Sequence, residues 1–210
     1  MKILTLLLNH FHTNTYICYD ENSKEAIVVD PSGHGERIVE EIVKNDLKVS
    51  YIVITHCHID HIMGLDKVKE FTDAKIICGY KDSDSINSAE KSLALNFHTT
   101  APKSIVDIKV RENDSFKIGN SEFTIIDTPG HSDGGICIYF KDDDTLFSGD
   151  TLFYESVGRT DFPGGSSKEL LQNIKQKLFT LPENTRVFPG HGCDTTIKHE
   201  KENKFFVLWN

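Results

Sequence analysis

The stretch Tyr51-Ile-Val-Ile-Thr-His-Cys-His-Ile-Asp-His-Ile-Met-Gly64 contains four potential metal ligands within six residues, directly after a short β-branched run. Residues 51–54 have the composition of a buried strand, which ends where the polar residues begin. His56 therefore starts a loop at the carboxyl end of a strand. Side chains alternate along an extended segment, so His56 and His58 converge while Cys57 points away, which argues against Cys57 as a ligand.

The other two donors of this stretch, Asp60 and His61, precede a helical-looking segment at residues 62–71. One tetrahedral ion cannot readily use four donors packed so closely, and a catalytic ion keeps one position open. Two ions are the simpler explanation, because burying three imidazoles and a carboxylate together without a metal would be costly. Imidazole and carboxylate suit zinc, which we expect, and also iron or manganese.

Length and composition favour one compact unit. The chain has 210 residues, of which 38% are hydrophobic and 26% charged, as is ordinary for globular proteins. This length is sufficient for one substantial core, so we expect a single domain over residues 1–210. The net charge of −9 disfavours binding to a phosphate backbone, and we expect no nucleic-acid partner.

The sequence favours a cytoplasmic location. No apolar run approaches the roughly 18 residues needed to span a membrane, so no membrane partner is expected. The apolar residues 1–8 are at the short limit for a signal peptide and lack a small-residue cleavage site, and they are interpreted as a first strand. The cysteines are odd in number and form no C-x-x-C pair, which fits a reducing compartment; they are Cys18, Cys57, Cys78, Cys137 and Cys193.

Three later strand ends also carry a possible ligand. Residues 122–128 resemble a strand that leads into Pro-Gly-His131, residues 145–148 precede Gly-Asp150, and a short strand from residue 186 ends in Pro-Gly-His191. Rigid scaffolds place functional groups in the loops at one edge of a sheet assembly. We therefore expect these three ends to lie beside the loop that follows residues 51–54.

The remaining segments are expected to complete an αβ framework. The pattern predicts strands at residues 17–19, 26–29, 75–78, 105–110, 116–118 and 136–140, and helices at residues 36–45, at residues 82–97 in an amphipathic or irregular form, and from the Ser166 cap through residue 179. His10, His12 and His34 have no further donors beside them. They are interpreted as surface histidines or as residues that support the ligands.

Seven side chains are candidate ligands, namely His56, His58, Asp60, His61, His131, Asp150 and His191. Two three-ligand sites require six, and a shared bridging ligand uses the seventh. A carboxylate bridges two cations because its two oxygens diverge, whereas a neutral imidazole cannot bridge in this way. Asp150 lies alone at its strand end, which favours it as the bridge.

These motifs resemble the metallo-β-lactamase superfamily and, within it, the short single-domain branch of glyoxalase II (hydroxyacylglutathione hydrolase)-like enzymes. Thr-His-Cys-His-Ile-Asp-His-Ile-Met-Gly matches the T-H-x-H-x-D-H-x-x-G signature, and the three later motifs follow in the family's order. The fold that the resemblance implies is an α/β one, the αβ/βα four-layer sandwich of two mixed β-sheets flanked by helices. It implies His56, His58 and His131 on one metal, Asp60, His61 and His191 on the other, Asp150 as the bridge, and Asp30 as a brace for the metal loops.

The expected function is a metal-dependent hydrolase, specifically a thioester hydrolase for an S-acyl small-thiol substrate such as S-lactoylglutathione. Two divalent ions would supply a bridging hydroxide at neutral pH, and Asp60 and Asp150 are the candidate catalytic residues. The sequence offers no obvious general acid besides the ligands. That favours a thiolate leaving group, with a thiol pKa of about 8.5, over an amine.

Substrate identity is less well indicated. Only 19 residues follow His191, whereas full-length glyoxalase II enzymes carry a C-terminal helical domain for the glutathione peptide, so another small thiol carrier is an alternative. By the resemblance, Arg159 is the candidate for binding a substrate carboxylate, and Asp161 and Cys193 stand where family members place tyrosines.

The main alternative reaction is that of a persulfide dioxygenase, a mononuclear-iron enzyme on the same fold. It would use His56, His131 and Asp150 as a two-histidine, one-carboxylate site. A secreted β-lactamase is disfavoured because no signal peptide is evident. The sequence does not indicate an oligomeric state.

Overall fold

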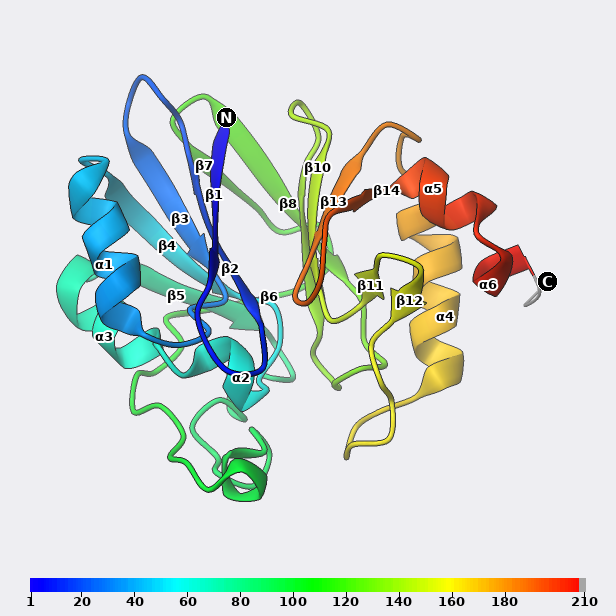
Figure 1. The fold of residues 1–210 in the computed structure, drawn as a ribbon, viewed down its shortest axis with the longest axis horizontal. Helices are drawn as coiled ribbons and strands as arrows, with labels where there is room; N and C mark the ends of the chain where they lie inside the picture. The colour runs from blue at the N-terminus through cyan, green and yellow to red at the C-terminus, as the bar shows by residue number, and fades with distance from the viewer. Residues whose placement is uncertain (208–210) are drawn as a thin grey trace.

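The computed structural model describes residues 1–207, which form two six-stranded sheets lying face to face with helices on both outer sides (Figure 1). The first sheet has its strands in sequence order: β1 (Lys2–Leu7), β2 (Asn14–Tyr19), β3 (Glu25–Val29), β4 (Lys48–Ile54), β5 (Lys75–Gly79) and β6 (Ile108–Val110). Its first three strands are antiparallel, and β3 to β6 are parallel.

The second sheet has the order β14 (Thr195–Thr196), β13 (Arg186–Pro189), β10 (Thr145–Gly149), β9 (Ile136–Phe140), β8 (Ser121–Asp127) and β7 (Ser115–Ile118). Its strands are antiparallel except for the parallel pair β10 and β13. A small hairpin of β11 (Leu152–Phe153) and β12 (Ser156–Val157) lies beside it.

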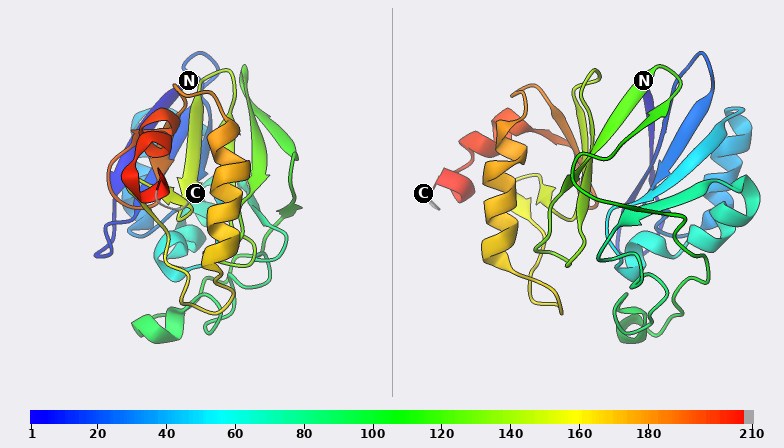
Figure 2. Two further views of the ribbon diagram at one scale, coloured as in Figure 1. Left: turned by 90° about the vertical axis from the view of Figure 1, so that its right-hand side faces the viewer. Right: turned by 180° about the vertical axis from the view of Figure 1, so that it is seen from behind.

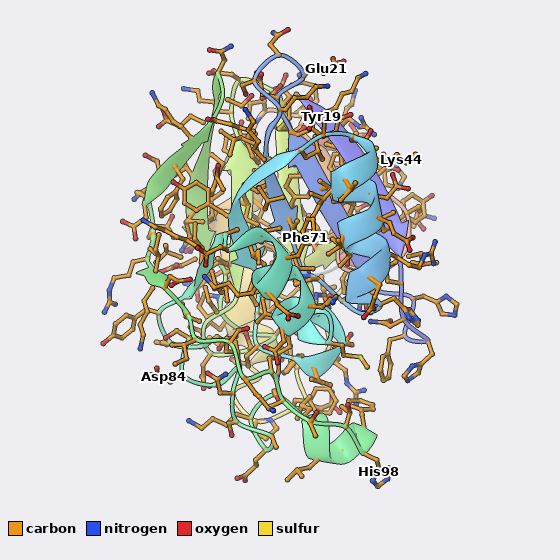
Figure 3. The ribbon with its side chains drawn as sticks, turned by 90° about the vertical axis from the view of Figure 1, so that its left-hand side faces the viewer. Tyr19, Glu21, Lys44, Phe71, Asp84 and His98 are labelled. Carbon is orange, nitrogen blue, oxygen red and sulfur yellow. The ribbon has the colours of Figure 1, made fainter. Side chains whose placement is uncertain are left out.

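Helices α1 (Gly35–Lys44) and α3 (Leu65–Thr72) cover the first sheet, and α4 (Ser167–Gln176) and α5 (Ile197–Glu202) cover the second (Figures 1 and 2). Lys44 on α1 and Phe71 on α3 mark the outer helical layer in Figure 3. The shorter helices are α2 (Ile59–Ile62), α6 (Lys204–Val207) and the 3₁₀ turns η1 (Ala94–Phe97) and η2 (Leu178–Thr180).

The alternation of side chains along the strands builds three apolar layers. In β4, Ile52 and Ile54 pack toward the helices of the first sheet, while Val53 packs between the sheets against residues such as Phe123 and Phe147. A third cluster fills the space between the second sheet and α4. A strand buried on both faces is a continuous apolar run, which is why residues 51–54 were recognisable. The expected αβ/βα sandwich of two mixed sheets is confirmed.

One expected element is wrong. Residues 82–97 form no α-helix; they form successive turns that end in η1. The hydroxyl of Ser83 donates to the carbonyl of Tyr80, and that of Ser88 accepts from the amide of Lys91. Such local bonds offer the backbone an alternative to helical pairing. Leu93 also lies in the left-handed region, with φ of 65°, which interrupts a helix.

The other differences are smaller. The helix expected from the Ser166 cap through residue 179 ends at Gln176 and continues as η2, although its cap is present, with the Ser166 hydroxyl accepting from the amide of Glu169. The strand expected at residues 105–110 begins only at Ile108, and Ile105 is exposed. Within residues 1–207, no helix combines the length and apolar character needed to cross a membrane.

Candidate metal centre

Four strands deliver the candidate ligands to one edge of the two sheets. The loop after β4 carries His56, His58, Asp60 and His61; His131, Asp150 and His191 follow β8, β10 and β13 respectively. Strands β8, β10 and β13 run in the same direction, so their carboxyl ends meet. The structure thus brings together all seven side chains that the sequence singled out.

The first triad consists of His56, His58 and His131, all at most 4% exposed. Nδ1 of His58 lies 2.8 Å from Nε2 of His131, which lies 3.2 Å from Nε2 of His56. An ion about 2.0–2.1 Å from each of two ligands at a tetrahedral angle would hold those ligands roughly 3.3 Å apart. The triad therefore has dimensions near those that a zinc-sized ion requires.

Hydrogen bonds on the far side of two rings fix their tautomers. Nδ1 of His131 donates to the carbonyl of Arg159 at 2.7 Å, because a carbonyl can only accept. The Thr55 hydroxyl donates to Asp30 and so accepts from Nδ1 of His56. Both rings therefore turn an unprotonated Nε2 toward the centre of the triad. Two lone pairs 3.2 Å apart repel each other unless a cation lies between them.

The second triad consists of Asp60, His61 and His191. Oδ2 of Asp60 lies 3.2 Å from Nε2 of His191 and 3.6 Å from Nε2 of His61. Nδ1 of His61 donates to Asp30 at 2.8 Å, which leaves its Nε2 facing the carboxylates. Unlike the first triad, this one carries a negative charge of its own.

Asp150 lies between the two triads and contacts both. Its Oδ1 is 3.2 Å from Nε2 of His61, and its Oδ2 is 3.5 Å from Nε2 of His131 and 3.6 Å from Nε2 of His191. Oδ1 of Asp150 and Nε2 of His61 are buried and lie near each other, but neither forms a hydrogen bond. Buried polar atoms are rarely left unpaired, so the arrangement of these two atoms fits ligands of a cation.

The pKa values of the histidines differ between the two triads. Burial, reinforced by the neighbouring imidazoles, holds the pKa of His56 well below its ordinary value and lowers that of His58 to about 3, so both rings are neutral. Burial alone would also lower the pKa of His61, but Asp150, Asp60 and Asp30 outweigh it and raise that pKa. The carboxylates thus favour positive charge at the His61 ring, whereas His56 and His58 are in the neutral form that binds metals.

Asp30 holds the loop after β4 from behind. Its Oδ1 accepts from the backbone amide of Thr55 at 2.7 Å, and its Oδ2 accepts from the Thr55 hydroxyl at 2.6 Å and from His61. Asp30 therefore contacts one ligand directly and orients His56 through Thr55. These are the contacts expected of a residue that braces a metal loop.

Sequence reasoning missed the supports of Asp60. The side-chain amide of Asn9 donates to the carbonyl of Asp60 at 2.7 Å, and the Thr13 hydroxyl donates to its Oδ2 at 3.2 Å. Both lie in the loop between β1 and β2, far from Asp60 in sequence. In the sequence, the one feature that could have indicated these contacts is the mostly polar run at residues 9–15, which follows the first strand.

Gly190 shows how closely the loops approach. A β-carbon at Gly190 would overlap Oδ1 of Asp150 and Cε1 of His61. A glycine is needed at this position because the backbone before His191 runs directly against two candidate ligands.

The other histidines and Cys57 lie apart from the seven. His10, His12 and His34 are exposed and belong to no ligand cluster in the described residues. Cys57 points into the core of the first sheet, with its sulfur 3.7 Å from the carbonyl of Lys91, as the alternation along the loop predicted.

Arg159 has its guanidinium at the surface, paired with both carboxylate oxygens of Asp161 at 2.6–2.7 Å and stacked 4.1 Å from the ring of Phe162. Its carbonyl, not its side chain, contacts a candidate ligand, through His131. The carboxylate-binding role expected for the side chain stays a prediction.

A cleft of about 490 Å³ opens beside His58. This volume lies in the range of sites for small molecules. Charged and polar side chains from the 80–91 segment and the loop after β8 contribute to its walls, among them Tyr80, Lys81, Lys91 and Asp133. A ligand in this cleft would lie next to the first triad.

Comparisons with known proteins agree with this geometry. A family model described as the metallo-beta-lactamase superfamily matches residues 8–191. The chain is 36% identical over 216 residues to a probable metallo-hydrolase of Streptococcus pyogenes, covering 98% of this chain and 90% of that one. It is 29% identical over 213 residues to the hydroxyacylglutathione hydrolase GloC of Haemophilus influenzae, covering 99% and 98%.

Solved structures show the same architecture. BLEG-1, a B3 metallo-beta-lactamase, aligns with a TM-score of 0.92 at 33% identity, covering 98% of this chain and 99% of that one. TTHA1623 in a di-iron-bound form aligns with a TM-score of 0.84 at 29% identity, covering 95% and 98%. ETHE1 from Myxococcus xanthus aligns with a TM-score of 0.80 at 27% identity, covering 99% and 89%.

Proposed function

Since the chain belongs to the metallo-β-lactamase superfamily, we propose that it is a dinuclear metal-dependent hydrolase that cleaves thioesters of small thiols. His56, His58 and His131 would hold one ion, and Asp60, His61 and His191 the other, with Asp150 shared between them. Zinc fits this set of imidazole and carboxylate ligands, as do iron and manganese. The similar protein with two bound irons supports a two-metal site.

The position of Asp150 is the observation that carries this proposal. Its Oδ1 lies 3.2 Å from His61 of the second triad, and its Oδ2 lies between His131 of the first triad and His191 of the second, at 3.5 and 3.6 Å. A carboxylate placed in this way can serve two cations at once. Its buried Oδ1 lies 3.2 Å from Nε2 of His61 but does not have the geometry of a hydrogen bond, which supports a role as a metal ligand.

The residues around the cluster set its chemistry. When bound, two divalent ions would lower the pKa of water to about 7 and polarise a carbonyl oxygen. Burial raises the pKa values of Asp60 and Asp150, but the surrounding histidines outweigh this effect and hold both pKa values below the ordinary value. Both side chains therefore contribute negative charge to the site. Asp30 and the Arg159 carbonyl keep the rings of His61 and His131 turned toward the centre.

The choice of thioesters is supported by what surrounds the ligands. In the part of the chain that is described, the side chains outside the seven that hydrogen-bond to them are Asn9, Thr13, Thr55 and Asp30. None of them is a general acid suited to protonating an amine, whereas a thiolate can leave without one. The similarity to a hydroxyacylglutathione hydrolase supports the same choice.

A persulfide dioxygenase is the second candidate. His56, His131 and Asp150 lie close enough to serve as a two-histidine, one-carboxylate site, with Nε2 of His131 3.2 Å from His56 and 3.5 Å from Asp150. That reaction would leave the second triad without a role, although Asp60 lies half-buried beside two histidines there. The complete second triad therefore favours hydrolysis.

The test is a substrate panel on protein of measured metal content. S-lactoylglutathione and other S-acyl thiols, a chromogenic β-lactam and glutathione persulfide with oxygen-uptake detection would be compared at equal enzyme concentration. We expect about two ions per chain and thioester hydrolysis far faster than β-lactam opening. One iron per chain with oxygen uptake, or β-lactam hydrolysis as the dominant activity, would contradict the proposal.

A further inference from the structure

Asp82 is a buried carboxylate outside the seven candidate ligands. It follows β5, is 2% exposed, and accepts three hydrogen bonds. Its Oδ2 accepts from the backbone amide of Cys57 at 3.0 Å and from the hydroxyl of Ser132 at 2.7 Å, and its Oδ1 accepts from the backbone amide of Gly134 at 2.8 Å. A buried carboxylate normally requires such donors to offset its desolvation.

These donors come from the two loops that carry the first triad. Cys57 lies between His56 and His58, and Ser132 directly follows His131. We propose that Asp82 is a positioning residue that sets the spacing of the first triad by joining these loops. The inference rests on the proposed two-metal site, because it assigns Asp82 a function toward the ion that this triad would hold.

The packing around Asp82 leaves the loops little freedom to move. A β-carbon on Gly134 would overlap the backbone nitrogen of Asp82 and lie 2.8 Å from its Oδ1. The amide of Asp82 itself donates to the carbonyl of Gly79, which closes a tight turn after β5. The carboxylate is therefore fixed on a strand end, as a support for neighbouring loops must be.

Asp82 differs from Asp30 in what it reaches. Asp30 contacts Thr55 and His61 and thus affects ligands of both triads, whereas Asp82 bonds Cys57, between His56 and His58, and Ser132, directly after His131, so its bonds adjoin the ligands of the first triad. The first triad consists of three imidazoles and has no charge of its own. Asp82 binds the backbone amide of Cys57, the residue between His56 and His58. Its negative charge would therefore complement a divalent ion held by the first triad.

The test is metal binding by Asp82→Asn, measured with Co²⁺ added to metal-free full-length protein. An asparagine keeps the size, but in either orientation its amide group faces a backbone N–H, of Cys57 or of Gly134. We expect affinity for the first-triad ion to fall about 10–100-fold, with an altered visible Co²⁺ spectrum, while affinity at the second triad stays unchanged. His58→Ala and His191→Ala assign the two binding phases.

Two companion variants sharpen the result. Asp84→Asn makes the same change two residues away, where the carboxylate is exposed and paired with Lys109 (Figure 3), and should leave both affinities unchanged. Ser132→Ala removes only one of the three bonds and should weaken first-triad binding less than Asp82→Asn does. Added to Asp82→Asn, it should have little further effect, because the two changes disrupt one network.

The outcomes separate the two proposals. If the unaltered protein fails to bind two Co²⁺ ions, the proposed function fails. If it binds two and Asp82→Asn binds both as well as the unaltered protein, or weakens both equally in step with a lower melting temperature of the metal-free form, then Asp82 is only a structural residue and this inference is overturned.

Discussion

The ligands of the first triad are at most 4% exposed, whereas His191 in the second triad has 28% of its side chain exposed. The first triad is enclosed by the bonds of Asp30, Asp82 and the Arg159 carbonyl. His191 lies on the open side, where it forms an isolated antiparallel bridge with Thr13 of the loop between β1 and β2. The centre thus combines an enclosed triad with a more accessible one.

The difference in exposure between the two triads predicts a difference in how firmly each would hold its ion. A buried set of neutral imidazoles holds an ion tightly because its ligands are already oriented. A partly exposed histidine allows ligands or water to reach the other ion. We expect the first ion to be retained more firmly and the second to exchange more readily.

Replacing Asp150 with alanine should have the largest effect, because it removes a carboxylate that lies within 3.6 Å of ligands in both triads. We expect thioester activity to fall by about 10³-fold or more and the metal content to drop below two per chain. Activity assays and elemental analysis would measure both. A variant that kept two tightly held ions and its activity would show that the halves are not linked through Asp150.

The comparison of His58→Ala with His191→Ala tests the asymmetry directly. The His191 variant should retain one ion that survives dialysis against a mild chelator, because the enclosed triad is intact. The His58 variant should lose that firmly held ion. Metal retained per chain against chelator concentration is the measurement. Equal retention by the two variants would refute the proposed difference.

Asp30→Asn should affect folding as well as binding, because three donors of Thr55 and His61 share this carboxylate. We expect the metal-free protein to lose about 3 kcal/mol of unfolding free energy, measured by urea denaturation. Asp73→Asn is the matched control, since that carboxylate is fully exposed at the end of α3. A stability equal to that of the control would mean that the brace contributes nothing.

Arg159→Ala should have the smallest effect. Its carbonyl, which holds His131, is kept in the variant, so metal content should stay at the unaltered value. If the guanidinium binds an anionic group of the substrate, KM should rise about tenfold with kcat little changed. Steady-state kinetics on charged and neutral thioesters would distinguish the two. An unchanged KM for both would remove Arg159 from the substrate site.

The sequence was most informative where chemistry and strand pattern coincided. The run 51–54 is apolar on both faces, and the donors after it stand at spacings that few other structures require, so the ligand loop and its neighbours could be predicted. His131, Asp150 and His191 were found by the same logic, because each follows a β run and a glycine. The fold then followed from the resemblance that these motifs carry.

The supports of the site were not predictable in the same way. The sequence around Asp82 does not indicate its role, because its three hydrogen-bond partners lie 25–52 residues away and two of them are backbone amides. The contact of Arg159 with His131 could not be predicted from side-chain chemistry, because it is made by the backbone carbonyl. The prediction of a helix at residues 82–97 is wrong because it depends on the amphipathic pattern alone, which does not indicate the competing hydrogen bonds of the serine side chains.

Asn14, the first residue of β2, contacts the segment that leads from β13 to His191. Its backbone amide donates to the Gly190 carbonyl at 2.7 Å, and its side-chain amide donates to the carbonyl of Pro189, 175 residues away in sequence. The centre therefore closes only after early and late segments have found each other, a slow step in chain assembly. Stable retention of two ions would then report that folding is complete, and a partly synthesised or nicked polypeptide would release metal before any loss of secondary structure became measurable.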